Sequence, residues 1–160
     1  MKVSEVFKPG VKSCTPLSSL DAVGRIMWES DCGAVPIVDA EGKVVGILTD
    51  RDMAMAMAAK DRAASQILVR ELTGGDLFTC VPEDEVAEAI RKMRRHRVRR
   101  LAVVDGRGQL LGMLSLKTLA LAATGGSGVS CEDVALTLQA VSKPRAEALP
   151  KWPWVNAASR

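Results

Sequence analysis

The chain has 160 residues, of which 48% are hydrophobic and 26% are charged, with a formal net charge of +3. These values are ordinary for a folded soluble protein, and the length suits one domain or two small halves that share a core. No apolar run approaches the roughly 18 residues that a membrane span needs. The N-terminal stretch MKVSEVFKPG also lacks the apolar segment of a signal peptide, so we expect a cytoplasmic protein.

Cysteine and histidine usage excludes the common zinc sites. The cysteines show no CxxC spacing and the chain has a single histidine. We therefore expect no metal site, and small buried thiols at Cys14, Cys32, Cys80 and Cys131. No nucleophile, metal cluster or acid–base pair stands out, so the sequence favours a protein that is not an enzyme.

The first half of the chain predicts the order strand, helix, strand, strand, helix. After a short apolar opening, the spacing of Leu20, Val23, Gly24 and Met27 is that of one helical face. Two strands, 34–38 and 44–48, are joined by a turn that begins with Asp39 and ends with Gly42, which is typical of a hairpin. A helix over 50–59 follows. Its alternating methionines cannot share one stripe, so we expect them to face both the core and a neighbouring subunit, with plain core filling as the alternative: Met53, Met55 and Met57.

The junction between the strand 44–48 and the helix 50–59 has the chemistry of a nucleotide site. A helix N-terminus presents unpaired N–H groups and partial positive charge, which suit a phosphate, and the Thr49 hydroxyl can donate to the same group. The two carboxylate oxygens of Asp52 suit the vicinal hydroxyls of a ribose, and Gly46 permits close approach to the backbone. The alternative is a plain helix cap.

The second half of the chain repeats the first at an offset of 66 residues. Residues 3–54 align with 69–120 without a gap, and strands are expected at 101–104 and 110–114, followed by a helix at 116–122. Two copies suggest two halves that bury their faces against each other. Identities include Val3/Val69, Glu5/Glu71, Cys14/Cys80, Asp39/Asp105, Gly42/Gly108, Gly46/Gly112 and Leu48/Leu114.

The hairpin pattern Val-Val-Asp-x-x-Gly-x-x-x-Gly, with the ending Gly-x-x-Thr-x-x-Asp, resembles a tandem pair of CBS domains, also called a Bateman module. The resemblance covers roughly residues 1–122, with repeats at 1–60 and 61–123. It implies an α/β (α+β) fold of two β-α-β-β-α repeats in a pseudo-twofold disc with two ligand clefts. It also implies AMP, ADP or ATP as ligand, less often S-adenosylmethionine or a dinucleotide. Such modules commonly form homodimers and regulate another protein rather than catalyse.

The resemblance also implies which residues bind. Thr49 and Asp52 would hold the ribose and phosphate in the first cleft, while basic residues of the other repeat would reach the phosphate. Adenine would lie against the backbone, with plain core packing as the alternative. In the second repeat Thr118 replaces the carboxylate, so that cleft is predicted to be the weaker site. Ala102 stands where the family has a proline, which the first repeat keeps as Pro36. The phosphate residues are Arg99, Arg100 and Lys117; the adenine residues are Cys14, Ala34, Val35 and Ile47; the weaker site has Ser115, Thr118 and Arg51.

The densest charge cluster, residues 91–100, can bind nucleic-acid phosphates. No aromatic residue interleaves to stack bases, and no DNA-binding motif frames the run. We favour a solvated helix face together with the phosphate-facing pair Arg99 and Arg100, and we expect His96 to lie at the surface or near the phosphate rather than to act as a catalytic base.

The C-terminal part has three segments: a Gly-rich joint at 124–128, a helix near 129–141 and a tail rich in proline and tryptophan. Ser130 and Asp133 match a capping box, and we expect the helix to dock on the module or on a partner subunit. Trp152 and Trp154 lie in an extended strip that is expected to cover an apolar surface of this chain, a dimer mate or another protein. Together these features predict an adenosine-nucleotide sensor that regulates an unidentified partner, with a nucleic-acid-binding protein and a ligand-free dimerisation scaffold as rivals.

Overall fold

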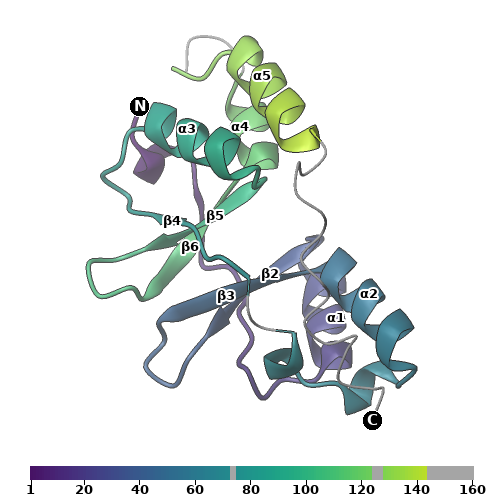
Figure 1. Ribbon diagram of the computed structural model, residues 1–160. Helices are drawn as coiled ribbons and strands as arrows, with labels where there is room; N and C mark the ends of the chain where they lie inside the picture. Colours follow the sequence, from purple (N-terminus) through teal and green to yellow (C-terminus); the bar gives the residue numbers. More distant parts are fainter. Residues whose placement is uncertain (73–74, 124–127, 144–160) are drawn as a thin grey trace. The chain divides into compact units, whose positions relative to one another are not determined.

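The computed structural model describes residues 1–72, 75–123 and 128–143. These residues form two compact units. Unit 1 contains residues 1–11, 78–123 and 128–143, and unit 2 contains residues 12–72 and 75–77. Each unit combines a small sheet with helices (Figure 1), which confirms the predicted mixed α/β fold.

Unit 2 consists of an antiparallel hairpin covered by two helices. Its core joins residues of the hairpin, such as Val35 and Leu48, to Val23 and Met53 of the helices. Leu20, Val23 and Met27 of the predicted helical face lie in this core, which confirms the helical periodicity at those positions. The elements are α1 (Leu20–Glu29), β2 (Ala34–Val38), β3 (Val44–Thr49), α2 (Asp50–Lys60) and two 3₁₀ turns, η2 (Ala64–Gln66) and η3 (Val69–Glu71).

Unit 1 is built on a four-stranded sheet with the order β1-β6-β5-β4. β4 runs parallel to β5, and the other neighbours are antiparallel. Helices α3, α4 and α5 pack with this sheet around one apolar cluster. The elements are η1 (Val3–Glu5), β1 (Lys8–Pro9), β4 (Thr79–Cys80), α3 (Val86–His96), β5 (Arg100–Val104), β6 (Leu110–Ser115), α4 (Leu116–Ala122) and α5 (Cys131–Ser142).

The offset of 66 residues holds for the strands and for their register. β2 and β3 have the same bounds as β5 and β6 after the shift, and each hairpin has an irregularity at the same place, Ile37/Val38 and Val103/Val104. The opening strand is a parallel pair in unit 1 and a single parallel bridge between Cys14 and Ile37 in unit 2. The predicted repeat is therefore confirmed at the level of hydrogen-bonded partners.

Both hairpin turns use the predicted Asp and Gly. Asp39 Oδ1 accepts hydrogen bonds from the backbone N–H groups of Glu41 and Lys43, at 3.0 and 2.8 Å. Asp105 Oδ1 makes the equivalent bonds in unit 1. Gly42 and Gly108 both have φ of +81°, a backbone conformation that residues with a Cβ rarely adopt.

The opening segments of the two repeats are exchanged. The Val3 N–H donates to the Asp84 carbonyl at 2.9 Å, and the Val69 N–H donates to the Ser18 carbonyl at 2.9 Å. Both valines are fully buried, Val3 in the core of unit 1 and Val69 in that of unit 2. The compact units therefore do not coincide with the sequence ranges 1–60 and 61–123, because each repeat packs its first turn on the body of the other.

Helix α5 has the predicted capping box. Ser130 Oγ accepts from the Asp133 N–H at 3.0 Å and donates to Asp133 Oδ2 at 2.8 Å. The helix packs against α3 and α4 (Figure 1), which confirms that it docks on the module. Its two ends differ slightly from the predicted range 129–141. Residues 124–127 of the Gly-rich joint and the tail with Trp152 and Trp154 lie outside the described residues.

The expectation of four buried thiols is wrong for two of them. Cys14 and Cys80 are buried, and burial raises the pKa of these thiols to about 11 and about 12. Cys32 and Cys131 are exposed, because they follow or begin a helix at the surface rather than lying in the sheet. Within the described ranges, no helix has the length and hydrophobicity of a membrane span.

Candidate functional site

The N-terminus of α2 is closed by a reciprocal cap. Thr49 Oγ1 accepts from the Asp52 N–H at 3.2 Å and donates to Asp52 Oδ2 at 2.6 Å. The Thr49 N–H donates to the same carboxylate oxygen at 3.0 Å. The plain-cap alternative is thus part of the structure.

This cap changes what the two side chains offer a ligand. The single hydroxyl proton of Thr49 is committed to Asp52, so it does not donate to a phosphate in this arrangement. Oδ2 of Asp52 already accepts two bonds, which corrects the expectation that both carboxylate oxygens face a ribose. No described residue donates to the other oxygen, Oδ1, and the side chain is half-buried. Asp52 therefore presents one acceptor oxygen, with two lone pairs, at the positive end of an eleven-residue helix.

The second repeat keeps the cap and loses the charge. Ser115 Oγ accepts from the Thr118 N–H at 3.1 Å, and the Ser115 N–H donates to Thr118 Oγ1 at 2.9 Å. Thr118 then donates its own proton to the Ser115 carbonyl at 2.7 Å. Thr118 therefore replaces Asp52 as a cap but provides no carboxylate, which is consistent with a weaker second site.

The residues predicted to hold adenine divide by burial. Val35 and Cys14 are buried in the core of unit 2. For these two residues the structure favours plain core packing over contact with adenine. Ala34 and Ile47 are half-buried on the hairpin, where Ala34 pairs with Thr49. Gly46 lies opposite Ile37, and a Cβ at Gly46 would come within 3.1 Å of Ile37 Cδ1. Packing inside the hairpin thus accounts for this glycine without a ligand.

The predicted phosphate residues gather at one edge of unit 1. Arg100 begins β5 and pairs with Ser115, while the Arg99 carbonyl accepts from the Leu116 N–H at 2.9 Å. Lys117 lies in the first turn of α4. Ala102 does not disturb the entry to this strand, because β5 begins at the position equivalent to the start of β2. The backbones of Arg99 and Arg100 therefore lie beside the capped N-terminus of α4, whose first turn carries Lys117; that these residues bind the phosphate of a ligand held by Asp52 remains a prediction.

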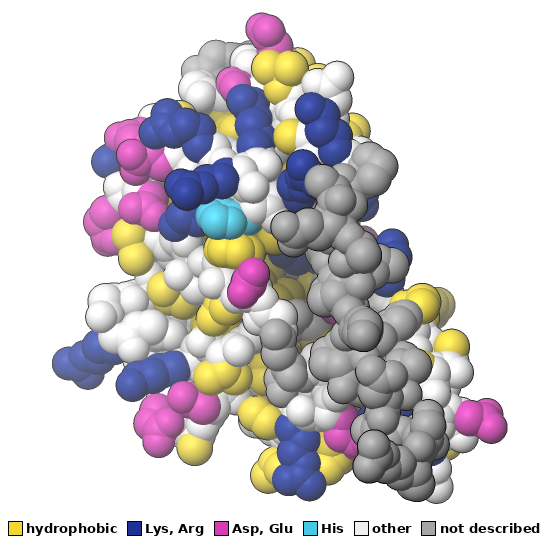
Figure 2. All heavy atoms as spheres, viewed as in Figure 1, with side chains coloured by type: hydrophobic (Ala, Val, Ile, Leu, Met, Phe, Trp, Pro, Cys, Tyr) yellow, Lys and Arg dark blue, Asp and Glu magenta, His cyan; other side chains and the backbone are white. Residues whose placement is uncertain are grey.

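The basic run 91–100 is distributed around α3 rather than forming one open surface. Arg94 donates to Thr137 Oγ1 and the Asp133 carbonyl, both at 2.9 Å. Lys92 donates to the Thr79 carbonyl, and Arg91 pairs with Glu88. His96 stacks on Phe78 with ring centroids 3.9 Å apart. Figure 2 shows acidic side chains among the basic ones on the face that carries the histidine. These contacts favour a structural role for the run 91–100 over nucleic-acid binding.

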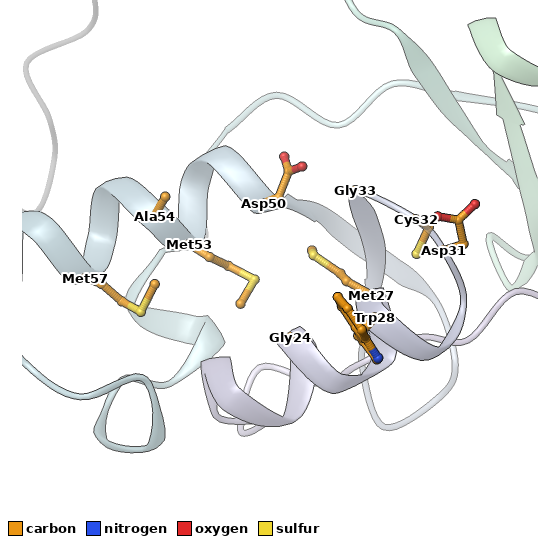
Figure 3. A pocket seen from close by; sticks show the side chains of 10 residues that line it. All are labelled: Gly24, Met27, Trp28, Asp31, Cys32, Gly33, Asp50, Met53, Ala54 and Met57. Carbon is orange, nitrogen blue, oxygen red and sulfur yellow. The ribbon is translucent and has the colours of Figure 1, made fainter.

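A groove that the sequence did not reveal lies between α1 and α2 of unit 2 (Figure 3). It has a volume of about 480 Å³. Gly24 of α1 and Ala54 of α2 line it with little or no side chain. Met27 and Met53 face each other across it, and the indole of Trp28 is 89% exposed at its side. The helical spacing of residues 24, 27, 28 and of 50, 53, 54, 57 indicates that each set lies on one helix face. The spacing does not tell whether that face is exposed or buried in the core, because both have the same periodicity. The remaining lining residues are Asp31, Cys32, Gly33, Asp50 and Met57.

Comparison with known proteins gives a consistent result. The family model of the CBS domain matches residues 3–59 and 69–125. The chain is 30% identical over 119 residues to the CBS domain-containing protein YhcV of Bacillus subtilis (strain 168), covering 74% of this chain and 83% of YhcV.

Solved structures of similar fold include nucleoside complexes. The CBS domain pair of protein MJ0100 in complex with 5′-methylthioadenosine and S-adenosyl-L-methionine has a TM-score of 0.68 and 21% identity, covering 76% of this chain and 94% of that one. CBSX2 in complex with AMP has a TM-score of 0.64 and 22% identity, covering 76% and 95%. At these identities the likeness establishes the fold alone.

Some relatives are much longer than the matched region. The chain is 30% identical over 112 residues to a homoserine O-acetyltransferase of Methanococcoides burtonii, but the match covers only 22% of that protein. Most of that protein therefore has no counterpart in this chain, and its activity is not transferred to this chain.

Proposed function

Because this chain belongs to the CBS-domain family, we propose that it is a regulatory module that binds an adenosine nucleotide at the N-terminus of α2. The observation that carries the proposal is the Asp52 carboxylate, whose Oδ2 is fixed by the cap while Oδ1 faces no described donor. A carboxylate that is already oriented binds a diol without losing much side-chain entropy. AMP and S-adenosylmethionine, which similar CBS-domain structures contain, both carry such a diol.

The division of charge between the repeats supports a nucleotide rather than a neutral ligand. Asp52 is the acceptor for ribose hydroxyls, and the partial positive charge at the start of α2 suits an anion. The cations Arg99, Arg100 and Lys117 of unit 1 would neutralise phosphate groups. Binding that requires groups of both repeats would favour one arrangement of the repeats, and this population shift is the proposed signal to a partner protein or dimer mate.

Titration calorimetry with AMP, ADP, ATP and S-adenosylmethionine tests the proposal. We expect at least one ligand to bind the wild type, and Asp52→Asn to weaken it. The amide oxygen of asparagine retains the cap acceptor but removes the charge. A hydrogen bond to a charged group contributes about 1.5–3 kcal/mol, so the expected loss is about tenfold to a hundredfold in affinity.

A matched control separates the loss of a cap from the loss of a binding group. Thr118→Ala removes the equivalent cap in unit 1, where no carboxylate is present, and should change affinity at the main site less than Asp52→Asn. The proposal fails if none of the four ligands binds, or if Asp52→Asn binds as tightly as the wild type. Lys117→Ala tests the phosphate prediction, since it should weaken AMP but hardly affect S-adenosylmethionine, which carries no phosphate.

We also propose that the module is a cytoplasmic homodimer that regulates rather than catalyses. The four thiols, none of them in a disulfide, suit a reducing compartment. Sedimentation velocity tests the dimer. The rival nucleic-acid function would give duplex binding that falls steeply with salt and is lost on neutralising Arg95 and Arg97. The contacts of Arg91, Lys92 and Arg94 within unit 1 make that outcome unexpected.

A further inference from the structure

A side chain that fills the core of unit 1 has no counterpart at the groove between α1 and α2 of unit 2. The offset of 66 residues relates Gly24 of α1 to Ile90 of α3. Ile90 is 4% exposed and belongs to the core of unit 1, whereas a Cβ at Gly24 would make only an ordinary contact, 3.6 Å from Met53 Cε. The groove volume of about 480 Å³ lies within the range of about 300–1,000 Å³ that is usual for small-molecule sites.

The charge of the groove is opposite to that of the equivalent residues in unit 1. Asp31 lies just beyond α1 with φ of +47°, and its equivalent Arg97 lies just beyond α3 with φ of +53°. The backbone conformation is therefore the same, while the charge changes sign. Trp28 likewise has a basic equivalent, Arg94. Asp31 and Asp50 both line the groove, and no lysine or arginine is among the described residues that line it, so the groove attracts cations and repels anions.

A glycine makes room for one of the two carboxylates. A Cβ at Gly33 would come within 2.8 Å of Asp50 Oδ2, which is closer than Cβ atoms approach other atoms in proteins. Asp50 Oδ1 accepts from the Arg51 N–H at 2.7 Å, which fixes the orientation of the carboxylate. The equivalent positions in unit 1 hold Arg99 and Leu116. The glycine and the carboxylate thus occur together in unit 2, and both are absent from unit 1.

The apolar part of the groove also suits a cation. The indole of Trp28 is 89% exposed at its side, and the thioethers of Met27 and Met53 face each other across it (Figure 3). An indole face attracts a cation within about 6 Å of the ring centroid, and methionine adapts to irregular apolar and aromatic bodies. We propose that this groove binds a small organic cation, whose apolar body contacts the thioethers while the indole and the carboxylates of Asp31 and Asp50 attract its charge.

The test compares three probes that share a phenyl ring: the cation benzyltrimethylammonium, the neutral benzyl alcohol and the anion phenylacetate. Titration of the full-length chain is followed by NMR of the indole N–H groups and of ¹³C-labelled methionine methyl groups, assigned with Trp28→Phe and with single methionine-to-leucine variants. We expect the cation to shift the Trp28 and Met57 signals with an affinity at least about tenfold higher than that of the other two probes. The Met55 signal is the internal control, since Met55 and Met57 are 36% and 37% exposed but only Met57 lines the groove.

Two aspartates with the same backbone conformation provide matched variants. Asp31 lines the groove and Asp61, at the end of α2, does not, although both have φ of +47°. Asp31→Asn and Asp50→Asn should each weaken binding of the cation about threefold to fivefold, because each removes one attracting charge. Trp28→Leu should weaken it by a similar factor through the loss of the indole face. Asp61→Asn should leave the affinity unchanged.

Equal affinity for the cation and for benzyl alcohol would overturn the proposal, because the groove would then be only an apolar surface. A cation that shifts Met55 as much as Met57, or that binds Asp31→Asn/Asp50→Asn as tightly as the wild type, would also overturn it. If no probe binds and the Trp28 and Met57 signals instead change over about a hundredfold range of protein concentration, the groove is an interface between copies of this chain and the proposal is wrong.

Discussion

The exchange of opening segments predicts that a mutation in one repeat destabilises the body of the other. Val3 is fully buried in the core of unit 1, although it belongs to the first repeat. Val3→Ala removes two methyl groups, each worth about 0.8 kcal/mol of transfer free energy, and leaves a small cavity. The expected loss in the stability of unit 1 is therefore about 2 kcal/mol.

Hydrogen exchange followed by mass spectrometry locates this loss. In Val3→Ala, amides of α3, β5 and β6 should exchange about thirtyfold faster where exchange requires opening of the unit, since 1.4 kcal/mol corresponds to a factor of ten. Val69→Ala should give the reciprocal result, with faster exchange in α1, β2 and β3. Both valines make the same backbone bond of 2.9 Å, so the two variants are a matched pair.

One pattern would refute the exchange. If Val3→Ala accelerates exchange in α1, β2 and β3 while α3 and β5 keep their protection, the first segment packs on its own repeat. Val45→Ala serves as the surface control, because Val45 is 43% exposed on β3 and its replacement should change neither unit measurably.

Three further predictions concern single contacts. The Glu71 carboxylate accepts from the Leu68 N–H and pairs with Lys60 and Arg62, and these contacts lower its pKa to about 2. Because the folded pKa lies below the ordinary glutamate pKa of 4.5, this stabilisation is present above about pH 4.5 and is lost as the pH falls toward 2. Glu71→Gln should therefore lower Tm at pH 7, with the difference from wild type shrinking in thermal melts below pH 4.5. Glu5 accepts the equivalent backbone bond from the Lys2 N–H but forms no ion pair among the described residues, so Glu5→Gln should lower Tm less. Arg94→Met should loosen α5 by about 2 kcal/mol, from the loss of hydrogen bonds made by a charged group, and hydrogen exchange should rise in α5 first, whereas the exposed Arg95→Met leaves it unchanged. Gly112→Ala should destabilise unit 1 by about 1–3 kcal/mol in urea unfolding, because its Cβ would overlap the Lys8 carbonyl and approach the Phe7 ring to 2.7 Å; Gly46→Ala should cost less, since it meets only the flexible end of Ile37.

Local patterns in the sequence predicted the elements well because the forces that form them act over a few residues. The Asp39–Gly42 turn is specified by a side-chain acceptor and a glycine with positive φ, both readable within four positions. The capping box of Ser130 and Asp133 is specified within the same span. The register of each hairpin follows from its turn, which explains why the strand bounds differ little from those predicted.

The exchange of segments could not be predicted in the same way. Val3 and Val69 are identical, as are Glu5 and Glu71, so the sequence gives no preference for either body. Which body each opening segment packs on depends on the path of the chain between that segment and the two bodies. Local periodicity carries no information about this path. The exposed thiols of Cys32 and Cys131 were missed for a related reason, because a small apolar residue at the end of a helix has the same local pattern inside and outside a core.

Comparison of the two repeats separates what the fold requires from what a site requires. Where both repeats keep a residue and its bonds, as in the Asp39 and Asp105 turns, the fold accounts for the residue. At Asp52 and Thr118 the cap geometry is the same, so folding alone would accept either residue, and the carboxylate in only one repeat needs another reason. Trp28 and Arg94 differ in the same sense: Arg94 donates hydrogen bonds to α5, whereas Trp28 is 89% exposed. The nucleotide site is thus proposed at a place where equal backbone geometry carries unequal chemistry.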